Sequence, residues 1–344
     1  MQFAMDLVER GVVPDWVTRF GIRQLLIRRL SEQHGDIERD RQAKQEFIAK
    51  LCGSPVAIDT GKANEQHYEV PPEFFQMVLG KRLKYSSCIY PSGCQTLDAA
   101  EERMLALTCD RAQITDGMDI LELGCGWGSL TLWMAEKFPN AKITAVSNSA
   151  PQRLFIEGRC RDRGFENVKI ITCDMNVFSI DQKFDRVVSV EMFEHMRNYR
   201  ILFARISNWL KDSGKLFFHI FVHDSYAYPF ADEKNDDWMA RHFFSGGIMP
   251  SDDLMLYFQE DLVAERHDRV SGLHYSRTSE DWLHNLDLHR DKAIKLFEKD
   301  MSHLDAVRQV NRWRVFFMAC AELFGFRGGQ EWYVSHYLYR RRMT

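Results

Sequence analysis

Three ionisable side chains lie close together in Val190-Glu191-Met192-Phe193-Glu194-His195-Met196, directly after a predicted buried strand. If this segment turns helically, Glu191, Glu194 and His195 occupy positions i, i+3 and i+4 on one face. Amines are mostly protonated near neutral pH, and only the free base can attack a methyl group. Carboxylates can attract the ammonium ion, and a histidine, with an ordinary pKa of about 6.5, can accept its proton. The spacing predicts a catalytic cluster for amine chemistry; the alternative is a helix start that merely favours negative charge.

A glycine-rich loop follows another predicted strand, in Leu121-Glu122-Leu123-Gly124-Cys125-Gly126-Trp127-Gly128. Gly124 and Gly126 would let a nucleotide-like ligand approach the carboxyl edge of a sheet. The spacing is not the G-x-G-x-x-G of dinucleotide sites, which place a pyrophosphate on a helix N-terminus. S-adenosyl-L-methionine has no phosphate and needs only room for its methionine part. We therefore predict this cofactor, with a purely structural turn as the alternative.

The end of the second predicted strand carries no carboxylate, in Ala145-Val146-Ser147-Asn148-Ser149. Dinucleotide enzymes place an acid there to hold ribose hydroxyls, so this stretch disfavours NAD. Ser147, Asn148 and Gln152 offer hydroxyl and amide groups to a ribose instead. Asp174, just after the third strand, is a candidate adenine contact or an ordinary loop acid.

The elements that position these residues alternate between β-rich and helical runs. Predicted strands cover Asp119–Leu123, Lys142–Ser147, Val168–Cys173, Phe184–Val190, Lys215–Val222, Leu262–Val270 and Glu331–Tyr339. Predicted helices cover Ser129–Phe138, Pro151–Gly164, Ile201–Lys211, and roughly 279–299 and 303–324. The first five strands are mostly continuous apolar runs, which indicates burial on both faces. The pattern predicts an α/β fold with a mostly parallel, doubly wound, seven-stranded sheet.

Two parts are expected along the chain. Residues 1–60 form an N-terminal helical cap, and residues 61–344 form the main domain, with an inserted lid at about 223–260 and a helical segment at about 278–325. Arginines interleave with apolar residues at helical spacing in the cap, so a membrane-surface helix is the alternative to packing on the core.

Composition excludes several classes of function. The formal net charge is -4, which gives no general attraction to nucleic acid or anionic lipid. The eight cysteines form no C-x-x-C pair, so we expect reduced thiols, no metal site and a cytoplasmic location. Acidic residues near the N-terminus do not fit a signal peptide, and no apolar run approaches the roughly 20 residues that cross a bilayer. We expect no stable membrane insertion, and the oligomeric state, a homodimer included, stays open.

Four motifs together resemble coclaurine N-methyltransferases, within the larger cyclopropane-fatty-acid-synthase-like superfamily. They are the glycine loop, the Glu-Met-Phe-Glu-His-Met run, Ala63-Asn64-Glu65-Gln66-His67-Tyr68 and Phe244-Ser245-Gly246-Gly247-Ile248-Met249-Pro250-Ser251. The resemblance covers about residues 55–340. It implies a class I methyltransferase (Rossmann-like) fold with a helical lid, and transfer of a methyl group from S-adenosyl-L-methionine to a small apolar or aromatic-ring amine.

The resemblance also implies roles for single residues. Glu191 and Glu194 would bind the amine and manage its proton, and His195 would be the general base. Cofactor contacts would include Tyr85, Ser86, Gly124, Gly126, Ser147, Asn148 and Gln152. Trp332 would face the substrate with its ring, although a tryptophan on a last strand is as often a core residue.

Cyclopropane synthases are the other branch of this superfamily, and they hold a bicarbonate near lipid alkenes. The matching positions here are Ser87, Glu194, His219, Phe221 and Tyr275, two of which are changed. The position of Glu191 is usually Gly in the synthases. The pattern favours an amine site, to which we assign His219, Phe221, Tyr275 and Trp332 as substrate-binding residues. A synthase or lipid-tail methyltransferase, and a non-catalytic cofactor-binding scaffold, are the alternatives.

Overall fold

The computed structural model describes residues 2–33, 35–58, 70–230 and 238–342. The motif Ala63-Asn64-Glu65-Gln66-His67-Tyr68 lies outside these described residues.

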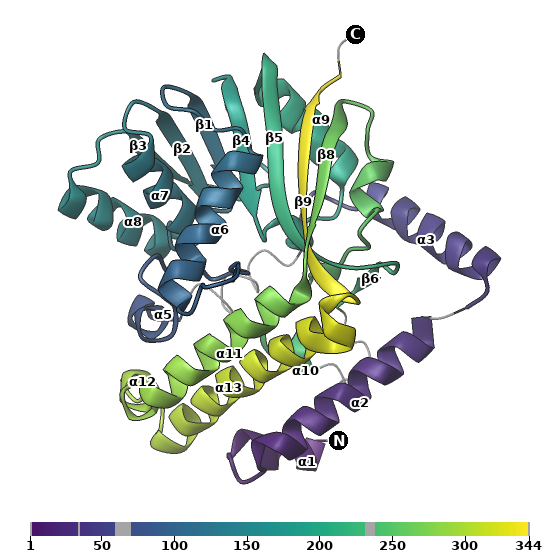
Figure 1. The fold of residues 1–344 in the computed structure, drawn as a ribbon, viewed down its shortest axis with the longest axis vertical. Helices are drawn as coiled ribbons and strands as arrows, with labels where there is room; N and C mark the ends of the chain where they lie inside the picture. The colour runs from purple at the N-terminus through teal and green to yellow at the C-terminus, as the bar shows by residue number, and fades with distance from the viewer. Residues whose placement is uncertain (1, 34, 59–69, 231–237, 343–344) are drawn as a thin grey trace.

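A seven-stranded sheet forms the centre of the molecule (Figure 1), as predicted. Its order is β3 (Val168–Thr172), β2 (Lys142–Ser147), β1 (Asp119–Leu123), β4 (Phe184–Val190), β5 (Leu210–His223), β9 (Trp332–Arg341) and β8 (Leu262–Val270). The first five strands pair in parallel, and β9 is antiparallel to both β5 and β8. The strand order reverses between β1 and β4. Ligands of open α/β sheets bind at such a switch point.

Successive residues of a strand point to opposite faces of the sheet, and in these strands the residues on both faces are apolar. Helices therefore cover both faces. On one face Ile120 and Phe217 pack with α6 (Leu97–Arg111) and α7 (Ser129–Lys137). On the other, their neighbours Leu121 and Phe218 pack with α9 (Tyr199–Trp209). The remaining helix of the parallel half is α8 (Ala150–Arg163), which begins at the Ser149 N-cap and ends at Gly164.

A layer of helices lies below the carboxyl edge of the sheet (Figure 1). It contains α5 (Pro72–Val78), α11 (Gly272–Leu288), α12 (Arg290–Phe297) and α13 (His303–Gly325), followed by the 3₁₀ turn η3 (Phe326–Gly329). The single helix predicted over 279–299 is wrong. Two helices separated at His289 occupy this region, and the first begins at Gly272, where the Ser271 side chain caps it by accepting the N–H of Leu273.

The segment predicted as a lid is only partly helical in its described residues. It contains β6 (Tyr228–Pro229), α10 (Trp238–His242), β7 (Ile248–Met249) and the 3₁₀ turn η2 (Leu254–Tyr257), and β6 pairs with β7. Pro229 and the pair Gly246-Gly247 disfavour a long helix there.

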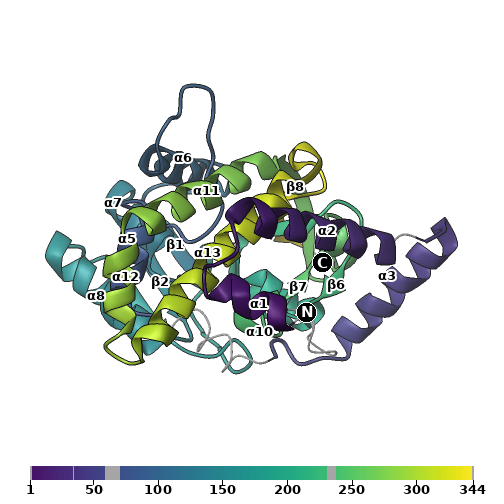
Figure 2. The ribbon, with the colours of Figure 1, turned by 90° about the horizontal axis from the view of Figure 1, so that it is seen from below.

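The N-terminal helices α1 (Gln2–Glu9) and α2 (Asp15–Gln33) lie beside α13, and α3 (Ile37–Cys52) continues toward α9 (Figures 1 and 2). Arg19 donates to Glu280 and Glu322, Arg23 donates to Glu322, and the Arg29 guanidinium lies 5.2 Å from the Tyr228 ring centre. These contacts use arginines that a membrane-surface helix would offer to lipid. No helix among the described residues has both the length and the apolar character needed to cross a membrane.

Candidate active site

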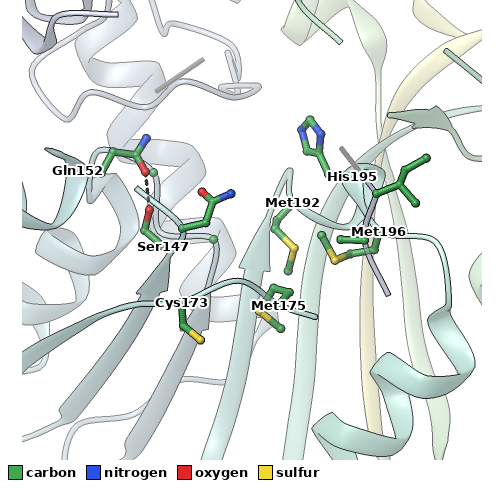
Figure 3. A pocket seen from close by; sticks show the side chains of 12 residues that line it. Ser147, Gln152, Cys173, Met175, Met192, His195 and Met196 are labelled. Atoms are coloured by element: carbon green, nitrogen blue, oxygen red, sulfur yellow. Dashed lines mark hydrogen bonds between the residues drawn. The ribbon is translucent and has the colours of Figure 1, made fainter. Parts of the chain in front are cut away.

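Two adjoining cavities lie at the switch point between β1 and β4. The larger, of about 190 Å³, extends from the glycine loop toward α11, α13 and the lid, and the smaller, of about 60 Å³, reaches the ends of β2 and β3 (Figure 3). Both are lined by Gly124, Gly126, Gln152, Met192 and His195. The predicted cofactor loop and the predicted catalytic segment therefore meet at one place.

The glycine loop is shaped for close approach. Gly124 has a φ of 79°, and a Cβ there would lie 2.7 Å from the Cβ of Met192. Gly126 has a φ of 51°, and a Cβ added there would meet nothing within 4 Å among the described atoms. The absent side chain of Gly126 leaves space at the cavity wall that a ligand can fill.

Hydroxyl and amide groups at the end of β2 line the smaller cavity (Figure 3). Ser147 Oγ donates to Gln152 Oε1 at 2.7 Å, and the Gln152 Nε2 donor is buried without a hydrogen-bond partner among the described atoms. Asn148 lines the same cavity. A buried donor without a partner is costly, so Gln152 is ready to bind a hydroxyl oxygen.

The structure places Asp174 differently from its neighbours. Its Oδ1 accepts the N–H of Asn176 at 2.7 Å, while Cys173 and Met175 line the cavity. This geometry fits the loop-acid alternative, and the adenine contact stays a prediction.

Tyr85 and Ser86 both line the larger cavity, as the resemblance implied. Their loop is held by the buried carboxylate of Glu101, which accepts the backbone N–H groups of Gly80, Arg82 and Lys84. Burial raises the pKa of Glu101 to about 7, against the effect of these N–H donors.

Lys84 was not foreseen as a site residue, since a lysine before Tyr-Ser has no recognisable signature. Its side chain is 2% exposed, and its ammonium group donates to Ser86 Oγ and, at 2.8 Å, to the Ser87 carbonyl oxygen. Burial lowers the pKa of Lys84, against the negative charges around it. The lysine fixes the loop and brings positive charge toward Glu191.

The Glu191 carboxylate lines the larger cavity and accepts three hydrogen bonds. Oε1 accepts from the Ser87 N–H at 3.0 Å and from His219 Nε2 at 3.1 Å, and Oε2 accepts from the Tyr275 hydroxyl at 2.6 Å. Burial raises the pKa of Glu191, while Lys84, Tyr275 and Ser87 oppose the rise. The donors make this a prepared anion beside an apolar space.

The single helical face predicted for Glu191, Glu194 and His195 is wrong. Glu191 has a φ of 47° and continues the pairing of β4, because its N–H donates to the His219 carbonyl. Only the 3₁₀ turn η1 (Phe193–His195) follows, and the Phe193 ring stacks on Phe218 in the core. The turn therefore buries Glu194, while Glu191 and His195 line the larger cavity.

Glu194 is fully buried beneath the site. Its Oε1 accepts the Phe221 N–H at 2.9 Å, and its Oε2 has no hydrogen-bond partner among the described atoms. Burial, and then the charge of Glu191, raise the pKa of Glu194 well above its usual value. This rise favours the neutral acid, and Glu194 lines neither cavity.

His195 lines both cavities and faces the space between the cofactor loop and the lid (Figure 3). Its ring stacks on Phe244, with ring centres 4.7 Å apart. The structure thus brings Glu191 and His195 to one cavity wall from a single short turn.

The four predicted substrate residues divide into three environments. Phe221 and Tyr275 line the larger cavity, and His219 lies behind Glu191 with no exposed surface. Trp332 is a correction: it is fully buried, its indole N–H donates to the Tyr228 hydroxyl at 3.1 Å, and it lines neither cavity. As the cross-strand partner of His223, it is a core residue.

The remaining wall of the larger cavity is apolar and was largely missed. The lid contributes Phe230, Met239, Phe244 and Met249, and α13 contributes Phe316, Cys320, Leu323 and Phe324. The α13 set has the spacing i, i+4, i+7 and i+8. In the sequence, this spacing indicates only the face of a helix that packs in the core. A wall of this kind suits an apolar or ring-bearing ligand.

The polar groups that match the synthase bicarbonate positions already have partners here. The Ser87 N–H, His219 and Tyr275 all bind the Glu191 carboxylate, and the Ser87 hydroxyl donates to the Cys88 carbonyl at 3.2 Å. The Glu191 carboxylate is therefore the anion that these donors bind here, in place of a bicarbonate.

Comparison with known proteins connects this site to two groups of enzymes. The model of the mycolic acid cyclopropane synthetase family matches residues 58–331. The (S)-coclaurine N-methyltransferase of Thalictrum flavum subsp. glaucum is 37% identical over 97% of this chain and 94% of its own length. The crystal structure of coclaurine N-methyltransferase bound to N-methylheliamine and SAH has a TM-score of 0.95, at 37% identity and 98% coverage of both chains. The cyclopropane-fatty-acyl-phospholipid synthase of Escherichia coli strain K12 is 30% identical over 54% of this chain and 46% of its own.

Proposed function

The chain belongs to the mycolic acid cyclopropane synthetase family and has the class I methyltransferase fold, and we propose a function on this basis. We propose that it is an S-adenosyl-L-methionine-dependent N-methyltransferase. Its substrate is a small apolar or aromatic-ring amine. The observation that carries the proposal is the Glu191 carboxylate, whose side chain is 10% exposed, on the wall of an apolar cavity beside the glycine loop. The chain is similar to the coclaurine enzyme over nearly its full length, and to the lipid synthase over about half.

The residues of the smaller cavity fit the cofactor. Gly126 leaves space, and Gln152 has a buried amide donor without a partner among the described atoms, which suits a ribose hydroxyl. Ser147 and Asn148 would hold the same part of the cofactor, and Tyr85 and Ser86 would lie along its methionine part. When bound, S-adenosyl-L-methionine supplies a methyl group on a sulfonium.

The chain's own residues prepare the amine. Glu191 attracts the ammonium ion, because a carboxylate at an apolar wall is screened little by water. His195 accepts the proton, which leaves the nitrogen lone pair free to attack. Glu194 supports the turn from beneath by accepting the Phe221 N–H, and the aromatic wall excludes water from the reacting atoms.

An assay with paired substrate classes tests the proposal. The purified protein is incubated with S-adenosyl-L-methionine and either a panel of secondary and tertiary ring amines or unsaturated phospholipid vesicles, and products are identified by mass. We expect methylated amines and no modified acyl chains. Product from lipid alone would contradict the proposal, and binding of the cofactor with no turnover would favour the scaffold alternative.

Two expectations remain proposals. We propose that the chain divides at about residue 60 and acts in the cytoplasm. The oligomeric state, a homodimer included, stays open, and light scattering of the purified protein measures it.

A further inference from the structure

A row of hydrogen bonds runs through the sheet to the back of Glu191. Arg111, at the end of α6, lies with Nη1 2.8 Å from His336 Nδ1. His336 Nε2 lies 3.0 Å from His219 Nδ1, and His219 Nε2 lies 3.1 Å from Glu191 Oε1. The two histidines are cross-strand partners on β5 and β9, and they are 0% and 1% exposed.

The chemistry of these groups fixes where each proton lies. An arginine can only donate, so His336 Nδ1 must accept and the His336 ring proton is on Nε2. That N–H donates to His219 Nδ1, which places the proton of His219 on Nε2, facing Glu191. Burial and the charge of Arg111 lower the pKa of both histidines well below the usual value, so both rings are neutral.

We propose that Arg111 and His336 are positioning residues that lock His219 in the Nε2–H tautomer, so that it always presents a donor to the Glu191 carboxylate. The lock acts through His219, and neither residue lines the cavity. The expected effect of the two residues on turnover rests on the proposed function, whereas the expected tautomers of the two histidines do not.

The same row cannot serve as a path for the proton released by the amine. Every group in it already donates toward Glu191, and the far end is a guanidinium that has no acceptor. An outgoing proton would have to reverse both histidines against Arg111. The proton must leave on the cavity side, where His195 lies.

The charge of Glu191 is also set by groups from other elements. It is faced by Lys84, Ser87 and Cys88 in the loop, Glu194 in η1, His219 in β5, Tyr275 in α11 and Cys320 in α13. Of these, only His219 is connected to Arg111 by the hydrogen bonds described above.

Nitrogen-15 spectra of the histidine rings test the lock in the cofactor-free full-length protein, with signals assigned through His219→Gln and His336→Gln. We expect the rings of His219 and His336 to remain in the Nε2–H tautomer from pH 6 to 9. In Arg111→Met, an Nδ1–H population of His336 should appear, while the matched variant Arg103→Met, of an exposed arginine on the same helix, should leave the spectrum unchanged. An Nδ1–H or doubly protonated ring in the unmodified protein, or no change in Arg111→Met, would overturn the proposal.

Steady-state kinetics with a methylated ring amine test the consequence. Losing one charge-assisted hydrogen bond from the row should lower kcat roughly tenfold in Arg111→Met, with KM for the cofactor unchanged. The acidic limb of kcat/KM should move to higher pH, because a carboxylate with a weaker donor holds its proton more tightly. His336→Gln, which can still accept and donate, should retain more activity than His336→Phe. Unchanged kcat and pH profile in Arg111→Met would overturn this part. If no amine is methylated at all, the spectra still decide whether the lock exists.

Discussion

Glu191 combines a left-handed backbone with a side chain that receives three donors. A non-glycine residue at a φ of 47° costs of order 1 kcal/mol, and the surrounding hydrogen bonds must hold it in place. The same turn places His195 on the cavity wall and buries Glu194. Polar residues of this segment therefore differ in environment according to where one turn places them.

Glu122 provides a stability test at this scale, because it is 3% exposed and its only described hydrogen bond is from the Thr131 hydroxyl at 2.5 Å. Burial raises its pKa to about 8, above the unfolded value of 4.5. The folded state therefore binds the extra proton, and this contribution to stability is full below pH 4.5 and lost as the pH rises through about 8.

Between pH 6 and 8.5 the unfolding free energy of the cofactor-free protein should fall. We predict that this fall is smaller in Glu122→Gln than in the unmodified protein, by up to about 3 kcal/mol. Urea denaturation at several pH values measures this difference. The exposed Glu166→Gln variant is the control and should follow the unmodified protein. Parallel curves for all three proteins would show that Glu122 does not hold a proton in the folded state.

Spacing in the sequence did not predict the orientation of the side chains at this scale. Glu191 and His195 do line the cavity, whereas Glu194 is buried and Trp332 belongs to the core. Periodicity assumes a regular helix, and η1 has only three residues. Such a turn is decided by the packing of Phe193 on Phe218, a contact between distant parts of the chain.

At the scale of elements, buried strands were the most predictable feature. The predicted bounds of β1, β2, β4 and β8 agree with the structure. The first three of these strands are mostly apolar and are followed by Gly124, Asn148 and Glu191, which mark their ends. The start of α11 was missed, since Ser271-Gly272 resembles a loop in sequence. The helix begins there because the Ser271 side chain caps it, and the backbone of Gly272, its first residue, lies against other backbone atoms.

Gly272→Ala should therefore be strongly destabilising. A Cβ would lie 2.2 Å from the Trp332 carbonyl oxygen and 2.4 Å from that of Phe324, and backbone atoms cannot move cheaply. We expect a loss of roughly 2–3 kcal/mol, measured by chemical denaturation. Gly21→Ala in α2, where nothing lies within 4 Å of the added Cβ among the described atoms, should instead stabilise by about 0.5–1 kcal/mol. A similar effect of both changes would refute the packing argument.

At the scale of the whole molecule, α13 joins the N-terminal helices to the site. Its Phe316 and Cys320 line the larger cavity, and its Glu322 accepts from Arg19 and Arg23 of α2. Sequence predicted helices at both ends but not their contact, because ion pairs between residues about 300 positions apart leave no local pattern.

Glu322→Gln should loosen α2 without affecting the sheet. Ion pairs that are partly exposed contribute about 0.2–1 kcal/mol, so we expect roughly two- to fivefold faster hydrogen exchange in α2. Glu32→Gln, which removes a pair between Arg28 and Glu32 within the helix, is the matched control and should change exchange less. Equal effects of the two variants would mean that the ion pairs of Glu322 do not hold α2 in place.

The most direct test of the central claim compares amine turnover and cofactor-product binding in Glu191→Gln, which keeps the shape of the side chain and removes its charge. We predict that kcat/KM for a ring amine falls roughly a hundredfold or more, while the Kd of S-adenosylhomocysteine, measured by calorimetry on the same sample, stays within about threefold. Glu166→Gln is the control. Unimpaired methylation of the amine by Glu191→Gln would contradict the account, because the Glu191 carboxylate would then have no part in the reaction.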